Sequence, residues 1–437
     1  MTILLVLLSI AILVILIVWA KLNPFLAFII SAISAGFLLG LPADQIAGSI
    51  QTGMGNLLGD LVIVIVMGAM LGKLVAESGA AQRIAGFLMG IFGEKNITWA
   101  MSITGLVVGI PLFYNVGFVL LVPLAFTVAY QYKISAVYVG IPLLAALSVT
   151  HGFLPPHPSP AALVAQFDAN MGLTLFYGFL IAIPTIIIAG PLFAKTLKNV
   201  HANPLKTFQA ETRPESELPG TFNSFFTALL PVFLLVSTTA LNLNIAPESA
   251  MAPLIKFVAN PGIVMLISVL VATYSLGLRR KYSMTQLMDI YTVATKDIAM
   301  ILLIVAGAGA LKQIFTDTGV SQVIADGLST WDIPPLILAW IITAIIRVCV
   351  GSATVAGLTT AGIIAPLVTT MNVDPNLLVL SIGAGSLMFS HFNDGGFWMY
   401  KEFFNVSIKD TIKTWSLMET LVAVIGLIGV LILDLFV

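Results

Sequence analysis

Long apolar runs alternate with short polar segments along most of this 437-residue chain. Apolar runs of about 20 residues, enough to cross a hydrocarbon core of ~30 Å, lie at 2–19, 172–194, 222–241 and 415–437. A segment inside a bilayer must satisfy its own backbone hydrogen bonds, so these runs predict transmembrane helices. The pattern therefore predicts an all-α polytopic membrane protein.

The longest polar stretch, 195–219, divides the chain nearly in half. We therefore expect a first half at 1–194, a polar linker at 195–221 and a second half at 222–437. Several lysines and arginines lie in the linker. Because basic residues favour cytoplasmic loops, we expect the linker to be cytoplasmic.

The two halves resemble each other at a constant separation. His151 and His391 lie 240 residues apart, and the same separation aligns the segment 77–85 with the segment 317–325. Two distant matches at one separation indicate an internal repeat. The basic cluster 279–281 has no basic counterpart near 39–44, which puts equivalent points on opposite sides of the membrane. The sequence thus predicts inverted-topology repeats, with the N-terminus outside.

Composition and charge narrow the function classes. The chain is 59% hydrophobic and 9% charged, with a net charge of −1 and one cysteine, Cys349. A chain with this net charge has no excess of basic residues that would bind nucleic acid. A single thiol can form neither an intramolecular disulfide nor a thiolate cluster that binds a metal. We expect a lipid bilayer as the surroundings and no nucleic-acid partner, metal or cofactor, and the sequence leaves a homo-oligomer open.

The apolar pattern breaks at corresponding places in the two halves, 148–160 and 389–398. The first break contains three prolines and the second contains adjacent glycines, which do not suit a regular helix interior. Non-helical backbone at membrane depth is tolerated where it lines a cavity. We therefore expect broken helices around a binding site; ordinary loops outside the membrane are the alternative.

A second pair of breaks lies at 109–118 and 347–362. In the later one, small residues from Gly351 to Thr354 let backbone approach a ligand, and a half-helix N-terminus attracts anions. Ser352 and Thr354 are candidate ligands for substrate hydroxyls. Helix packing through small residues is the alternative, especially for Thr359 and Thr360.

Several of these motifs together resemble the gluconate permease family of proton symporters. They are SVTHGFLPPHPSP (148–160), GSATVA (351–356), SHFNDGGFW (390–398), GAMLGKLVAESGAAQRIA (68–85) and LFYNVGF (112–118). The resemblance implies import of D-gluconate or a related sugar acid with a proton across the cell inner membrane, on a fold of inverted repeats with re-entrant hairpins. The family also includes carriers of D-serine and other hydroxy acids. Asn115 departs from the family pattern, because many members have an acidic residue there.

Ionisable and polar residues at the breaks are the candidate site residues, since such residues are costly within membrane segments. Arg347 could pair with a substrate carboxylate through its planar guanidinium, or form a fixed structural ion pair. Asp394 could titrate or cap the next half-helix. The candidate substrate-binding residues are Arg347, Ser352, Thr354, His151, Asn393, Asn115, Thr150 and Ser390. The candidate proton-coupling residues are Asp394, His391, His151 and Glu419, with satisfied core histidines as the alternative for the two imidazoles.

Three other functions compete with proton-coupled import. A sodium-coupled carboxylate carrier would use the same architecture, and a passive channel is disfavoured by the paired breaks. A membrane-embedded hydrolase is the remote alternative: His151, His157 and Asp394 could imitate a metal site, but the sequence has neither HExxH nor GxSxG. We therefore expect a secondary active transporter rather than an enzyme.

Overall fold

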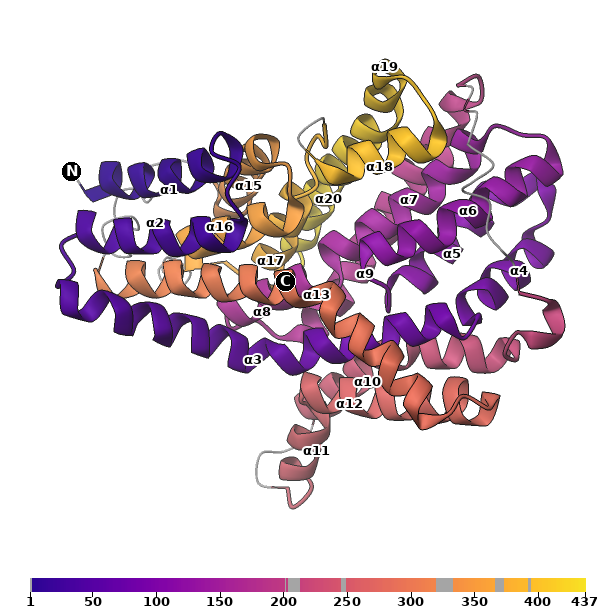
Figure 1. The fold of residues 1–437 in the computed structure, drawn as a ribbon, viewed down its shortest axis with the longest axis horizontal. Coiled ribbons are helices and arrows are strands. Elements are labelled where there is room, and N and C mark those ends of the chain that lie inside the picture. The colour runs from indigo at the N-terminus through magenta and orange to yellow at the C-terminus, as the bar shows by residue number, and fades with distance from the viewer. Residues whose placement is uncertain are drawn as a thin grey trace.

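The computed structural model describes residues 2–200, 202, 213–244, 249–319, 333–365, 373–391 and 394–437. Within these ranges the chain forms helices and connecting turns, without strands (Figure 1). Six described helical segments are long and apolar enough to cross a membrane, and a seventh is added if α3 (Ala43–Glu77), bent by 45°, counts as one span. The predicted all-α multi-pass architecture is confirmed. Asn393 lies outside the described residues.

The first half contains nine α-helices between the N-terminus and the linker. They are α1 (Thr2–Val18), α2 (Pro24–Leu38), α3, α4 (Ala80–Phe92), α5 (Ile97–Gly109), α6 (Tyr114–Tyr132), α7 (Ala136–Phe153), α8 (Pro158–Gln166) and α9 (Met171–Ile187). A π-helical turn, η2 (Ile188–Leu192), continues α9.

The described helices of the second half follow the linker. They are α10 (Thr221–Asn244), α11 (Ala252–Ala259), α12 (Pro261–Ala272), α13 (Met284–Asp317), α15 (Pro335–Val350), α16 (Ala353–Ile364), α17 (Pro375–Gly385), α18 (Gly395–Phe404), α19 (Ile408–Thr411) and α20 (Leu417–Asp434). The π-helical η9 (Ile412–Ser416) joins α19 to α20.

The helix order of the first half recurs in the second. Moving α3 forward by 240 residues gives 283–317, against Met284–Asp317 for α13, and moving α5 gives 337–349, against Pro335–Val350 for α15. The pairs α6 and α16, α7 and α17, and α8 and α18 follow in the same order. The recurrence agrees with an internal repeat; that the two copies are inverted stays a prediction.

The two long helices α3 and α13 lie side by side and form the base on which α2 and α12 pack (Figure 1). Their backbones approach each other closely where two glycines face each other. A Cβ atom at Gly53 would lie 2.3 Å from the carbonyl oxygen of Gly309, and one at Gly309 would lie 2.4 Å from that of Gly53. Only glycine allows this contact, since both distances are far below van der Waals separation.

Two helical hairpins and two broken helices carry the predicted breaks. In the hairpins, residues 110–113 join α5 to α6, and Gly351 and Ser352 join α15 to α16. In the broken helices, residues 154–157 separate α7 from α8, and residues 386–394 separate α17 from α18. The first break is narrower than its polar sequence segment, because α7 continues through His151 to Phe153. Proline disrupts the helix only from position 155 onward.

Candidate functional site

A chain of hydrogen bonds joins the end of α15 to the break before α18. Arg347, in the last turn of α15, is 3% exposed, and its Nη2 atom lies 2.5 Å from Oδ2 of Asp394. Ser390 donates its hydroxyl to the same carboxylate oxygen, and Trp415 Nε1 donates to Ser390 Oγ at 2.7 Å. Asp394 also caps α18, since its Oδ1 accepts from the Gly396 amide at 2.9 Å. The ion pair and the helix cap, both alternatives raised by the sequence, are therefore present together.

The guanidinium of Arg347 keeps unused donors in this arrangement. Its Nε and Nη1 atoms are buried and have no hydrogen-bond partner among the described residues. A buried donor without an acceptor is costly, more so when it is charged. Arg347 can therefore donate hydrogen bonds to an additional anionic or hydroxyl-bearing group while it stays paired with Asp394.

A second carboxylate, Glu419, lies beside this pair on α20. It is 2% exposed, and its Oε1 accepts a hydrogen bond from Ser148 Oγ on α7. Arg347 and Asp394 interact electrostatically with Glu419. The ionisable residues of the cluster thus come from α15, α20 and the break before α18.

Aromatic rings pack around the polar residues of the cluster. Tyr114, in the first turn of α6, has its ring centroid 5.8 Å from that of His151 and 6.1 Å from that of Trp415. His151 interacts electrostatically with Arg347 and Asp394, and its Nδ1 is buried without a partner among the described residues. His151 therefore faces the same cluster as Arg347.

The other two break histidines contact helix-end carbonyls. His157 Nε2 lies 2.8 Å from the Gly109 carbonyl at the end of α5, and His391 Nε2 lies 2.9 Å from the Val348 carbonyl at the end of α15. Each contact joins a broken helix to the hairpin of its own half. His391, a candidate for proton coupling, is thus engaged with backbone in this conformation.

The remaining candidates make local contacts only, as far as the structure describes them. Ser352 caps α16, because its hydroxyl accepts from the Val355 amide at 3.4 Å, and Thr354 lies half-buried in the first turn. The Thr150 hydroxyl donates to the Leu147 carbonyl of its own helix at 2.8 Å. Asn115 is described only by its backbone position, next to Tyr114 in α6.

Three residues of the cluster were not predicted: Ser148, Tyr114 and Trp415. Helical spacing could have indicated two of them, since Ser148 lies three residues before His151 and Trp415 lies four before Glu419. Such spacings place side chains on one helix face.

A cavity of about 10 Å³ reaches the first break, where Pro111, Phe113 and His157 contribute to its wall. That volume holds about one water molecule. This conformation is therefore closed around the first break.

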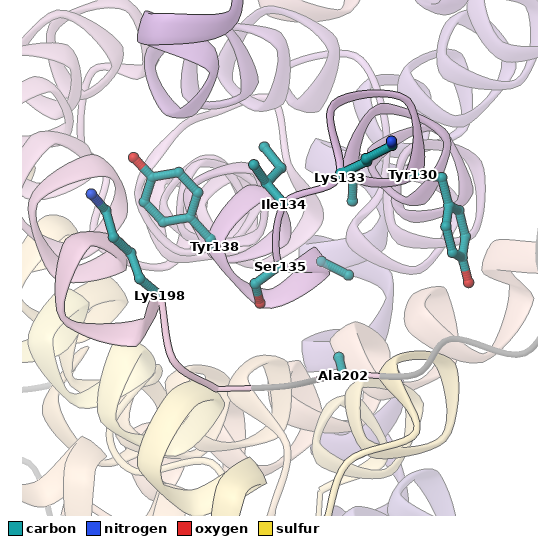
Figure 2. A pocket seen from close by; sticks show the side chains of 9 residues that line it. Tyr130, Lys133, Ile134, Ser135, Tyr138, Lys198 and Ala202 are labelled. Carbon is teal, nitrogen blue, oxygen red and sulfur yellow. The ribbon is translucent and has the colours of Figure 1, made fainter.

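A larger cavity lies elsewhere, between the α6–α7 turn and the residues after α9 (Figure 2). It measures about 550 Å³, with Lys133, Ser135, Tyr138 and Lys198 among its lining residues. The Lys198 Nζ atom lies 5.5 Å from the centre of the Tyr138 ring. This cavity is open and does not include the Arg347 cluster. Within the described ranges, no group of three or more His, Cys, Asp or Glu residues is placed to hold a metal ion.

Comparisons with known proteins cover the whole chain. The model of the GntP family permease matches residues 1–436. The chain is 45% identical over 436 residues to the high-affinity gluconate transporter of Escherichia coli (strain K12), covering 100% of both chains. It is 44% identical over 427 residues to the Gnt-II system L-idonate transporter of the same organism, covering 98% of this chain and 97% of the relative.

A third relative and a solved structure also match the chain over most of its length. Identity to the gluconate permease of Bacillus subtilis (strain 168) is 43% over 449 residues, with 100% of both chains covered. The crystal structure of the Alcanivorax borkumensis YdaH transporter matches with a TM-score of 0.69 at 17% identity, covering 94% of this chain and 98% of that one. At that identity the structural match indicates a shared fold alone. From the family match and the three full-length relatives, we conclude that this chain belongs to the GntP family of permeases.

Proposed function

We propose that this protein imports gluconate or a closely related sugar acid together with a proton, by alternating access in the cell's inner membrane. Its relatives named for gluconate and L-idonate transport align over nearly their full lengths. Both named substrates are sugar acids with one carboxylate and several hydroxyls. The chemistry expected of the site is therefore one anion contact and several hydrogen bonds.

The buried guanidinium of Arg347 is the observation that carries this proposal. A carboxylate leaving water needs a compensating charge and hydrogen bonds, or its desolvation costs several kcal/mol. Arg347 supplies a permanent charge, and its Nε and Nη1 donors are unused within the described structure. Asp394 neutralises the arginine while the substrate is absent.

In this proposal, residues around Arg347 bind the hydroxyl groups of the sugar acid. Ser390 donates a hydrogen bond to the Asp394 carboxylate, and the buried Nδ1 of His151 has no partner among the residues that the structure describes. Ser352 and Thr354 contribute from the α16 N-terminus, where the helix dipole also favours an anion. Thr150, which lies beside Gly109, is left out of this hydroxyl-binding set, because its own hydroxyl donates to the Leu147 carbonyl of its helix.

The closed conformation and the recurring helix order support alternating access. A six-carbon acid does not fit a cavity of about 10 Å³ at the first break, so the region must open to admit it. Two halves with one element order can supply two states of similar energy, open to opposite sides.

Alkylation of Cys349 tests substrate binding directly. This single cysteine is exposed and lies two residues after Arg347. The proposal predicts that gluconate slows maleimide labelling of the purified protein, with L-idonate as a second ligand and glucose, which lacks the carboxylate, as the control. D-serine protection without gluconate protection would assign a different substrate. Equal labelling rates with all ligands, together with no calorimetric binding heat, would contradict the proposal.

A further inference from the structure

The two carboxylates of the cluster have very different partners. Asp394 receives hydrogen bonds from Arg347, Ser390 and the Gly396 amide, and its side chain is 16% exposed. Glu419 receives one hydrogen bond, from Ser148, and is 2% exposed. Within the described chain, Glu419 forms no ion pair.

The described helices packed against α20 supply no basic side chain that could pair with Glu419 alone. Three of these elements, α9, η2 and α17, contain no Asp, Glu, Lys, Arg or His. From α15 comes Arg347, which is already bound to Asp394, and from α7 comes His151. Tyr114 of α6 interacts electrostatically with Glu419, and Lys413 of η9 is exposed.

A lone carboxylate in such surroundings is unstable as an anion and takes up a proton instead. Asp394 is the opposite case, because an arginine and two further donors stabilise its charge. Paired acidic groups whose environments separate them in this way commonly divide acid and base roles. From this contrast, we infer that Glu419 carries the coupled proton, whereas Asp394 stays ionised as the internal counter-ion of Arg347. This inference rests on the proposed function.

The charge of the cluster then explains the coupling. Arg347 and Asp394 cancel, so an ionised Glu419 leaves one net negative charge that repels a substrate carboxylate. A proton bound to the Glu419 carboxylate removes that charge. Proton and sugar acid therefore each bind more tightly in the presence of the other, and this linkage is reciprocal. The proton enters from bulk water on one side and returns to bulk water on the other.

Proton uptake on substrate binding tests this assignment. The full-length protein in detergent is mixed with gluconate in weak buffer containing a pH indicator. Wild type is expected to take up protons as it binds gluconate, with an uptake per bound gluconate that equals the fraction of unloaded Glu419 that is ionised at the chosen pH and therefore rises toward one proton as the pH is raised. Glu419→Gln is expected to bind gluconate without proton uptake and, in proteoliposomes, to exchange gluconate while losing accumulation driven by a pH gradient. Glu402→Gln, an exposed glutamate beside Lys401, is the matched control and should behave as wild type.

The outcomes separate the two proposals. Absence of gluconate binding to wild type would contradict the proposed function itself, whereas unchanged proton uptake in Glu419→Gln would overturn this inference alone. If Glu419→Gln does not fold, infrared spectroscopy replaces it. Labelling the aspartates of wild type with ¹³C should leave the protonated carboxyl band at its frequency, and a shift of that band would assign the proton to an aspartate such as Asp394.

Discussion

Arg347 at the end of α15 is paired with Asp394, 47 residues later, at the N-cap of α18. This ion pair joins the α15–α16 hairpin to the break between α17 and α18. It also places a permanent cation beside the carboxylates of Asp394 and Glu419. Arg347 is therefore placed to bind the substrate carboxylate, to interact with the carboxylate that we propose carries the proton, and to join the two breaks of the second half.

Replacing Arg347 by lysine is expected to weaken gluconate binding while keeping the charge. Lysine loses the planar array of donors, so the cost should be about 1.5–3 kcal/mol, as for a charged hydrogen bond. This corresponds to a roughly tenfold to 150-fold increase in Kd. Calorimetry on the purified variant measures it. Near-normal affinity in a folded Arg347→Ala protein would place the anion at helix N-termini instead.

The crossing of α3 and α13 should tolerate no side chain at Gly53. A Cβ there would meet the Gly309 carbonyl oxygen at 2.3 Å, so Gly53→Ala should force the helices apart and destabilise the protein by about 1–3 kcal/mol. Gly55→Ala is the matched control on the same helix, since its Cβ would meet nothing within 4 Å. Thermal unfolding in detergent compares the two. Equal melting temperatures of the two variants would contradict this close contact between α3 and α13.

Membrane orientation is tested at the linker. We predict that residues between α9 and α10 face the cytoplasm, because basic residues are concentrated there. Ser216, exposed in the described part of the linker, is changed to cysteine in a Cys349→Ser background. An impermeant maleimide should label it only after the cells are broken. Labelling in intact cells would reverse the predicted topology.

Much of the fold follows from the sequence because its signals are local. Apolar runs predict helices, and prolines 155, 156 and 158 predict the first break, since each acts on its own stretch of backbone. Arg347, Asp394 and Glu419 stand out as candidates because ionisable residues are rare in apolar segments.

The detailed partners do not follow from the sequence, because they depend on contacts between distant segments. Ser148 and Glu419 lie 271 residues apart, and nothing local to either residue predicts their hydrogen bond. Likewise, Trp415 reaches Ser390 from η9. Thr150 illustrates the opposite case: its hydroxyl looks available in sequence, but a helical threonine can bond its own preceding turn.

The central claim is that an inward proton gradient drives gluconate uptake. Radiolabelled gluconate uptake into proteoliposomes with an imposed pH gradient, with and without sodium, measures this directly. The account predicts accumulation that is independent of sodium and abolished by a protonophore. Uptake that requires sodium and ignores the pH gradient would contradict it.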